Sequence, residues 1–249
     1  MAGKYEGKTA VITGGSTGIG FEAARIFLRE GGKAVVTARS AAALDAAAKE
    51  LGSNAFTLVS DAANIQDIAK LAEVAKARLG EVDFLFVNAG IAKFSPLESV
   101  TPEFWDEQHG INAKGAYFTV QKLAPLLRKG SGVVLNTSVV DEKGMPSTSV
   151  YAASKAALRS LARTLAAELV GRGVRVNAVS PGPVTTPIYD KLGLPADARV
   201  GFEAQMREGN PMKRFGLPEE VARAALFLAF DATYTTGAEF PVDGGLTQL

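Results

Sequence analysis

The sequence has no cysteine and a single histidine, His109. The lack of cysteine excludes disulfides, thiolate catalysis and cysteine-based zinc sites. The single histidine excludes a metal site built from several imidazoles, and any Ser-His-Asp triad would have to use it. We interpret His109 as a helix-surface or subunit-contact residue, and we expect no bound metal.

An excess of charge of one sign and a long hydrophobic run are missing as well. Lys and Arg total 27 and Asp and Glu total 26, which leaves a net charge of +1. Such a balance draws a protein neither to nucleic acid nor to an anionic membrane. No stretch reaches the roughly 18 apolar residues of a membrane span, and residues 1–8 carry charge without an apolar segment. We therefore expect a cytoplasmic enzyme with no nucleic-acid or membrane partner.

Apolar or β-branched runs alternate with stretches that have helical spacing and are rich in Ala, Leu, Glu and Lys. Several runs are apolar throughout, as strands buried on both faces of a parallel sheet are. The alternation predicts a single-domain, doubly wound α/β (Rossmann) fold over residues 1–249, with a seven-stranded, mainly parallel sheet and helices on both faces. Strands are expected at Thr9–Thr13, Ala34–Ala38, Phe56–Ser60, Phe84–Asn88, Val133–Ser138, Val174–Val179 and Glu239–Val242. Helices are expected at Ile19–Glu30, Ala41–Leu51, Ile65–Leu79, Pro102–Leu127, Tyr151–Val170 and Pro218–Phe230.

The stretch from Pro181 to Gly209 interrupts this regularity with prolines at 181, 183, 187 and 195. A long excursion in a compact domain is usually functional, and this one leaves a strand at its carboxyl end, where ligands bind in open α/β sheets. We expect a substrate loop at about residues 184–209 that forms a movable pocket wall together with Val139–Val150. A pair of helices packed on the core is the alternative. Apolar side chains of the loop suit a substrate with an apolar body: Ile188, Tyr189, Leu192, Leu194, Phe202 and Met206.

Residues 13–20 read Thr-Gly-Gly-Ser-Thr-Gly-Ile-Gly and stand between the first expected strand and the first expected helix. The glycines at 14, 18 and 20 would allow a tight turn, a close approach to a pyrophosphate and close packing of helix on strand. The start of the helix would offer N–H groups and partial positive charge to phosphates. A glycine-rich turn without a ligand is the alternative, but the position after the first strand favours a dinucleotide. The Gly-Lys-Ser/Thr ending of an ATP-binding P-loop is missing.

The end of the second expected strand indicates which dinucleotide would bind. NAD sites commonly have a carboxylate there for the ribose 2′-hydroxyl, and this chain has none. Arg39 could pair with a 2′-phosphate instead, and Ser16, Thr17 and Ser40 could add hydroxyl donors. A solvated Arg39 is the alternative. The missing acid and the present base together predict NADP(H).

Tyr151 and Lys155 stand four residues apart at the start of an expected helix, so their side chains share one face. A free tyrosine has a pKa of about 10, too high for ready proton exchange near pH 7. A nearby ammonium would lower the pKa of Tyr151, and so would an oxidised nicotinamide. The pair alone is close to a chance match. Ser138, at the end of the fifth expected strand, adds a hydroxyl that could bind a substrate carbonyl or cap a turn.

These residues belong to a longer ordered series of short motifs. The series comprises the Thr-Gly-x-x-x-Gly-x-Gly turn at 13–20, Asp61, Asn88-Ala89-Gly90, Asn112, Ser138, Tyr151 with Lys155, and Pro181-Gly182 with Val184 and Thr186. With this series the sequence resembles the short-chain dehydrogenase/reductase family over nearly its whole length. Within that family it is most similar to the bacterial 3-oxoacyl-(acyl carrier protein) reductases and related NADPH ketoreductases.

The resemblance implies a role for each motif. Asp61 and Ala62 would contact adenine, and the segment 88–90 would support the sheet and touch the adenine ribose. Asn112 would hold a water that links Lys155 to solvent, while the segment 181–186 would bind the nicotinamide, its amide or a phosphate. The predicted catalytic residues are Asn112, Ser138, Tyr151 and Lys155. The predicted cofactor-binding residues are Gly14, Ser16, Thr17, Gly18, Ile19, Gly20, Arg39, Ser40, Asp61, Ala62, Asn88, Ala89, Gly90, Tyr151, Lys155, Pro181, Gly182, Val184 and Thr186.

The expected reaction is hydride transfer between the B face of NADPH and a ketone or aldehyde. Ser138 would position the carbonyl oxygen, Tyr151 would donate the proton, and Lys155 would tune Tyr151 and hold the ribose. An NAD-dependent alcohol dehydrogenase and a non-catalytic NADP-binding sensor are the alternatives. The resemblance also implies a homotetramer built from the helices near Pro102–Leu127 and Tyr151–Val170 and from the C-terminal strand.

Charged residues near these motifs have weaker interpretations. Asp141 and Glu142 follow the fifth expected strand and could face the pocket, although a solvated loop explains them at least as well. Arg128, Lys129 and Arg172 could contact an acidic acyl carrier protein, but ordinary charges at the end of a helix explain them better.

Overall fold

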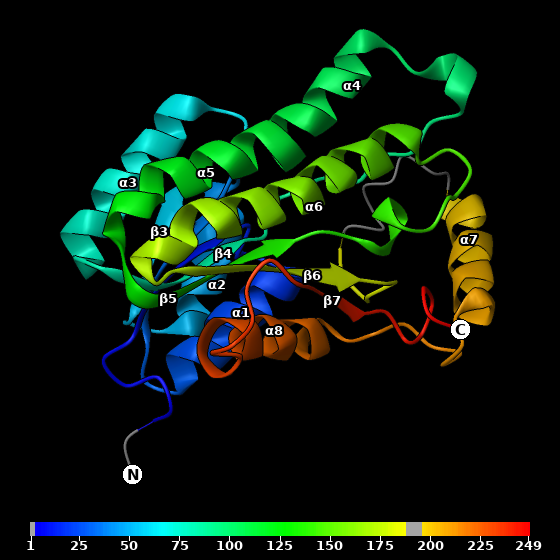
Figure 1. Cartoon of the computed structure of the whole chain (residues 1–249). Helices are drawn as coiled ribbons and strands as arrows, with labels where there is room; N and C mark the ends of the chain where they lie inside the picture. Colours follow the sequence, from blue (N-terminus) through cyan, green and yellow to red (C-terminus); the bar gives the residue numbers. More distant parts are fainter. Residues whose placement is uncertain (1–2, 188–195) are drawn as a thin grey trace.

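The computed structural model describes residues 3–187 and 196–249, which contain one seven-stranded sheet (Figure 1). The strand order is β3-β2-β1-β4-β5-β6-β7, and each neighbouring pair is parallel. The sheet is thus parallel throughout, and the predicted Rossmann fold is confirmed. The strands are β1 (Thr9–Thr13), β2 (Lys33–Ala38), β3 (Ala55–Val59), β4 (Val82–Val87), β5 (Leu127–Asn136), β6 (Arg175–Pro181) and β7 (Glu239–Val242).

Helices cover both faces of the sheet (Figure 1). On one face, α1, α2 and α8 bury an apolar cluster that includes Phe27 and Leu44; on the other, α3, α5 and α6 bury a second cluster around Leu71 and Leu158. Full burial of a side chain such as Phe27 contributes about 1.5–3 kcal/mol. No helix in the described part of the chain is long and apolar enough to cross a membrane. The helices are α1 (Gly18–Arg29), α2 (Ala41–Leu51), α3 (Ile65–Leu79), α4 (Pro102–His109), α5 (Ala116–Leu123), α6 (Ser149–Leu169), α7 (Ala196–Gly209) and α8 (Pro218–Leu226).

The strand order reverses between β1 and β4, which lie side by side in the middle of the sheet. In open α/β sheets, ligands bind in the crevice that such a reversal leaves at the carboxyl ends of the strands. The glycine-rich turn follows β1 and Asn88 follows β4. The fold therefore brings these two motifs together at the same edge.

The segment expected as one helix over Pro102–Leu127 is in fact divided. A π-helical segment, Gly110–Gly115, separates α4 from α5, and a 3-10 turn leads into β5. Gly115 packs so closely on the Ala62 carbonyl that a Cβ atom would overlap it. Pro125 then ends the helix, because it lacks an N–H group and restricts the preceding residue. Helical spacing alone does not reveal such tertiary contacts.

The stretch from Pro181 to Gly209, expected as irregular chain, contains the helix α7. Surrounding prolines and an internal Gly201 conceal its helical pattern in the sequence. In Figure 1, α7 lies at the end of the sheet, close to the C-terminus. The expected wall residues Ile188, Tyr189, Leu192 and Leu194 lie outside the described residues.

Candidate active site

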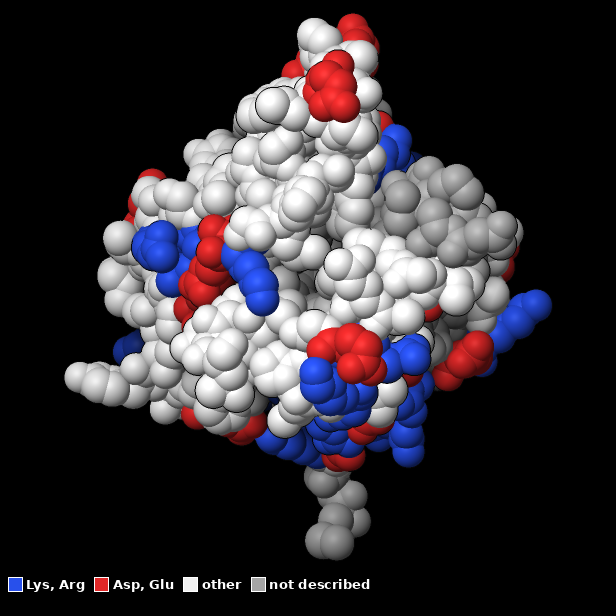
Figure 2. All heavy atoms as spheres, turned by 90° about the vertical axis from the view of Figure 1, so that its right-hand side faces the viewer, with Lys and Arg blue, Asp and Glu red and all other residues white. Residues whose placement is uncertain are grey.

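A cavity of about 720 Å³ opens at the carboxyl ends of the strands. Figure 2 shows the α7 end of the molecule, where uncharged residues cover most of the middle and Lys and Arg gather toward the lower edge. Gly20 and Asn112 lie outside the lining. The predicted residues that line the cavity are Gly14, Ser16, Thr17, Gly18, Ile19, Arg39, Ser40, Asp61, Ala62, Asn88, Ala89, Gly90, Ser138, Tyr151, Lys155, Pro181, Gly182, Val184 and Thr186.

The glycine-rich turn has the backbone geometry that its sequence predicts. Gly14 and Gly18 have φ values of +65° and +60°, a region that strains residues with side chains. A Cβ atom on Gly20 would overlap the Gly14 carbonyl, so Gly20 serves close packing. α1 begins behind Thr17, whose side chain caps none of the first N–H groups in the described structure. These N–H groups remain available to a phosphate.

Asn88 braces this turn. Its Nδ2 donates to the carbonyls of Thr13 and Gly14 at 3.0 and 3.1 Å, and its Oδ1 accepts from Asn136 Nδ2 at 2.8 Å. The Thr13 hydroxyl accepts from the backbone N–H groups of Asn88 and Ala89, both at 3.0 Å. Asn136 was missed from the sequence, although its position at the carboxyl end of a buried strand was a usable signal.

The segments after β2 and β3 surround one end of the cavity. Arg39 is exposed at its rim, and among the described residues no ion pair holds its guanidinium. Ser40 is the N-cap of α2, and its hydroxyl accepts from Ala43 N at 3.2 Å. The Asp61 carboxylate accepts from Ala63 N at 2.9 Å. Arg39 is therefore a cation free to bind an anion at this rim.

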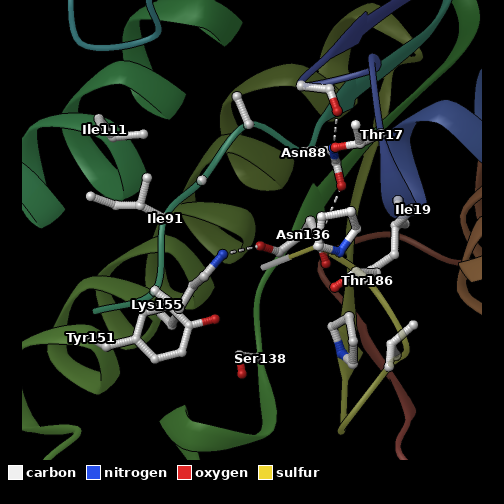
Figure 3. A pocket seen from close by; sticks show the side chains of 18 of the residues that line it. Thr17, Ile19, Asn88, Ile91, Ile111, Asn136, Ser138, Tyr151, Lys155 and Thr186 are labelled. Atoms are coloured by element: carbon white, nitrogen blue, oxygen red, sulfur yellow. Dashed lines mark hydrogen bonds between the residues drawn. The ribbon is translucent and has the colours of Figure 1, made fainter. Parts of the chain in front are cut away.

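The chain after β6 closes the cavity over the glycine-rich turn (Figure 3). Thr186 lies over Gly18, since a Cβ atom built on Gly18 would be 3.1 Å from the Thr186 Cγ2. Gly182 lies against the backbone of Asp243, where a Cβ atom would be 2.8 Å from the Asp243 Cα. The fold thus places the segment 181–186 beside the glycine-rich turn, and both line the cavity.

Ser138, Tyr151 and Lys155 meet at the other end of the cavity (Figure 3). Ser138 lies two residues beyond β5, which ends at Asn136 and not at Ser138 as expected. Lys155 Nζ donates to the Asn136 carbonyl at 2.6 Å and lies 5.8 Å from the centre of the Tyr151 ring. A side-chain hydrogen bond joins Ser138 and Tyr151. The three side chains form one contiguous group.

Burial controls the protonation of this group. Burial raises the pKa of Tyr151 to about 12. The hydrogen bond with Ser138 lowers this pKa, but its effect is smaller than that of burial. Burial lowers the pKa of Lys155 to about 8. Desolvation of the phenolate is the largest cause, so the pKa of Tyr151 lies above its ordinary value in the protein alone, and a lowering of that pKa by Lys155 stays a prediction. Tyr151 is a neutral phenol, the form that can donate a proton.

Asn112 lies behind the cavity, in the π-helical segment between α4 and α5. Its amide accepts from Ile91 N at 2.9 Å and donates to the Ile91 carbonyl at 2.9 Å and to Ser154 Oγ at 3.0 Å. The Ser154 hydroxyl in turn donates to the Tyr151 carbonyl at 2.7 Å. Asn112 thus connects the loop after β4 to the first turn of α6. Its role in a proton relay stays a prediction.

An apolar wall stands beside Tyr151. The centre of the Phe94 ring is 6.0 Å from that of Tyr151 and 6.0 Å from that of Phe202 on α7. Met206 of α7 continues the wall. Phe94 was missed from the sequence, because an aromatic residue in a loop carries no local sign of the ring that it will contact. The other apolar lining residues after β5 are Val139, Val140 and Met145.

Several charges considered in the sequence have structural partners. Arg128 Nη2 is 2.5 Å from Asp83 Oδ1, and Arg172 Nη2 donates to the carbonyls of Ala124 and Leu127 at 2.7 and 3.2 Å. Arg172 lies at the end of a helical segment as expected, whereas Arg128 lies in β5 and not at a helix end. Within the described residues, no group of three or more His, Asp or Glu side chains could hold a metal ion.

His109 and Trp105 lie on the surface of α4. Their rings stack with centres 4.1 Å apart, and Trp105 is 44% exposed. The expectation of a helix-surface histidine is met.

Known proteins resemble this chain over its whole length. A family model described as enoyl-(acyl carrier protein) reductase matches residues 14–247. An oxidoreductase of Sarocladium schorii is 42% identical over 249 residues, which cover 99% of this chain and 98% of that protein. The 3-oxoacyl-[acyl-carrier-protein] reductase of Thermotoga maritima is 36% identical over 98% of this chain and 99% of that protein. A solved short-chain dehydrogenase/reductase from Brucella melitensis, described as a glucose/ribitol dehydrogenase, superimposes with a TM-score of 0.92 at 31% identity and covers 100% of both chains.

Proposed function

Since the chain belongs to the short-chain dehydrogenase/reductase family, we propose that it is an NADP(H)-dependent oxidoreductase that reduces a ketone or aldehyde to an alcohol, reversibly. The family uses nicotinamide cofactors, and the relatives are dehydrogenases and reductases. The observation that carries the proposal is one cavity that joins the glycine-rich turn to the Ser138–Tyr151–Lys155 group.

In the proposed reaction, the nicotinamide supplies the hydride that the carbonyl carbon accepts. Ser138 donates a hydrogen bond to the carbonyl oxygen and holds it beside the Tyr151 hydroxyl. Tyr151 transfers its proton to that oxygen as the alcohol forms, because an alkoxide is a stronger base than a phenolate. The Lys155 ammonium stabilises the phenolate that remains. Lys155 keeps this charge below a pH of about 8, in line with its lowered pKa.

The preference for NADP(H) over NAD(H) is supported by the rim of the cavity after β2. Arg39 offers a free guanidinium there, and a guanidinium pairs well with a phosphate. The uncapped N-terminus of α1 suits the pyrophosphate, and the left-handed glycines let the backbone approach it. The residues at the rim after β2 thus suit the 2′-phosphate of NADP, and the glycine-rich turn with the start of α1 suits its pyrophosphate.

The substrate in this proposal has an apolar body attached to its carbonyl group. Phe94, Phe202 and Met206 form an apolar wall next to Tyr151. The charged lining residues Lys93 and Glu107 pair with each other at 2.5 Å, so neither is spare for a charged substrate.

We further propose a cytoplasmic homotetramer, as the family resemblance implies. Exposed apolar side chains support association: Trp105 on α4 and Phe240 on β7 are each 44% exposed. β7 is also an edge strand of the sheet, and unpaired edges invite pairing with another chain. Light scattering of the purified protein would give the subunit number.

Turnover of a broad panel of ketones with NADPH and with NADH tests the proposal. We expect turnover of apolar ketones with a clear preference for NADPH, which Arg39→Asp should lower about tenfold or more, since it replaces a charge-assisted hydrogen bond by repulsion. Arg29→Asp, at the far end of α1, is the matched control. Tight NADPH binding without any turnover would instead support a non-catalytic sensor, and a preference for NADH would support the NAD-dependent alternative.

A further inference from the structure

Asp141 is a buried carboxyl directly behind Ser138. It ends the 3-10 turn η4 (Val139–Asp141), and its backbone N–H donates to the Ser138 carbonyl at 3.2 Å. Both carboxyl oxygens are buried, and neither has a hydrogen-bond partner among the described residues. Asp141 does not line the cavity, so these oxygens face the protein interior. Both expected positions, in the pocket or in a solvated loop, are therefore wrong.

A second carboxylate lies near Asp141, on β7. The Glu239 side chain is 7% exposed, and its Oε2 is 3.0 Å from Arg159 Nε on α6. The Thr137 hydroxyl donates to the other carboxylate oxygen of Glu239 at 2.5 Å. We call Thr137, Asp141, Arg159 and Glu239 the acid cluster. The Arg159 guanidinium pairs with Glu239 through Nε and donates to the Gly237 carbonyl through Nη1, and no ion pair joins Asp141 to a cation among the described residues.

A buried carboxyl in this position avoids an uncompensated charge by keeping its proton. Burial, followed by the negative charges of Glu239 and of the exposed Glu142, raises the pKa of Asp141 to about 7, while Arg159 opposes this shift. The charge of Asp141 also affects two titratable side chains on α6. A negative charge on Asp141 raises the pKa of Tyr151 and that of Lys155.

We propose that Asp141, whose carboxyl is buried without a partner in the turn that directly follows Ser138, is a positioning residue of the active site that acts on Tyr151. Asp141 touches neither the cavity nor a substrate, so it acts through Tyr151. The ionisation of Asp141 is independent of the proposed function, whereas the coupling to Tyr151 rests on it.

The first consequence concerns stability. The pKa of Asp141 is raised in the folded chain from an ordinary value near 4 to about 7. Between these values the unfolded chain has released the proton and the folded chain has kept it, so folding loses stability as the pH rises. The contribution is complete below about pH 4 and lost above about pH 7. Asp141→Asn cannot ionise and lacks this dependence.

The second consequence concerns catalysis. Alcohol oxidation needs Tyr151 as a phenolate, so its rate rises with pH through the pKa of Tyr151 in the cofactor complex. In wild type, Asp141 is ionised above about pH 7 and repels that phenolate. Asp141→Asn removes the repulsion and should move the rising limb to lower pH by about one unit, as expected for one like charge in a partly buried site.

The experiment uses the full chain as wild type, Asp141→Asn and the control Glu98→Gln, which removes an exposed carboxylate from the 3-10 turn Leu97–Ser99. Thermal denaturation is followed at about pH 5 and pH 8 without cofactor. The rate of alcohol oxidation with NADP⁺ is then measured from about pH 6 to about pH 10, which includes the range above pH 7 where Asp141 is ionised, with the alcohol of the best ketone substrate. We expect the Tm of wild type to fall by several degrees relative to Asp141→Asn between the two pH values. The rising limb should shift in Asp141→Asn and stay in place in Glu98→Gln.

Two results would overturn the proposal. A difference in Tm that is the same at both pH values would mean that Asp141 does not titrate in this range. Superimposable oxidation profiles, despite a pH-dependent Tm difference, would mean that Asp141 does not act on Tyr151. A chain without turnover on any ketone would overturn the proposed function and the coupling together, while the pH-dependent Tm difference would still report the ionisation of Asp141.

Discussion

Different interactions hold the two ends of the cavity. We call the end with the glycine-rich turn the cofactor end, and the end with Tyr151 and the apolar wall the substrate end. At the cofactor end, side chains bind backbone: Asn88 donates to the Thr13 and Gly14 carbonyls, and the Thr13 hydroxyl accepts from two N–H groups. At the substrate end, side chains contact side chains from distant segments, as Phe94 does with Phe202. Backbone-directed hydrogen bonds fix one geometry, whereas packed rings allow many residue combinations. The cofactor end should therefore tolerate little change, and the substrate end should be adjustable.

Tyr151→Phe, at the substrate end of the cavity, should have the largest effect. It removes the proton donor but keeps the ring beside Phe94. We expect the kcat of ketone reduction to fall about 10²–10⁴-fold, the usual size of general acid catalysis. NADPH affinity, measured by fluorescence titration, should change little. Tyr117→Phe on α5, outside the cavity lining, is the matched control and should keep its activity. Near-native turnover of Tyr151→Phe would remove Tyr151 from the mechanism.

Asn88→Ala should weaken the cofactor end. It leaves two carbonyl groups and the Asn136 amide without their partner, which should cost about 1–3 kcal/mol of stability and loosen the glycine-rich turn. NADPH affinity should fall with it. Asn64→Ala removes the N-cap of α3 at a cost of about 1 kcal/mol and should spare NADPH affinity. An equal loss of NADPH affinity in both variants would mean that general destabilisation causes it, and not the loss of the Asn88 hydrogen bonds to the turn.

Phe94→Ala should have the smallest effect on kcat, and its effect on KM should depend on the size of the ketone. Removing one ring from the apolar wall should raise the KM of bulky apolar ketones several-fold, by lost burial, and leave kcat for a small ketone within about twofold. Leu97→Ala, 81% exposed in the same loop, is the control. If Phe94→Ala changed kcat for all ketones alike, the wall would be positioning Tyr151 and not selecting substrates.

The same contrast explains what the sequence could predict. The central strands were predictable because burial on both faces makes them apolar, as in β4, where every residue is buried. The geometry of the glycine-rich turn was predictable because residues 14–20 specify it in consecutive positions. The Glu239 charge acts on Asp141 only in the folded chain, since 98 residues separate the two, and no local pattern indicates this interaction. The division of the helix after His109 likewise depends on Gly115 packing on the Ala62 carbonyl.

The raised pKa of Tyr151 could not be predicted from the sequence. The four-residue spacing to Lys155 indicates proximity, but burial is a property of the folded chain. Desolvation of the phenolate therefore raises this pKa in the protein alone, whereas the pair by itself indicates a lowering.

The most direct test of the account follows the hydride itself. NADPH that carries deuterium on the B face of C4 is incubated with a prochiral apolar ketone and the wild-type protein, and the alcohol is analysed by mass spectrometry and NMR. The proposed function predicts one deuterium on the carbinol carbon, and none when the label is on the opposite face. Formation of the alcohol with the label retained on the cofactor or lost to water would contradict it.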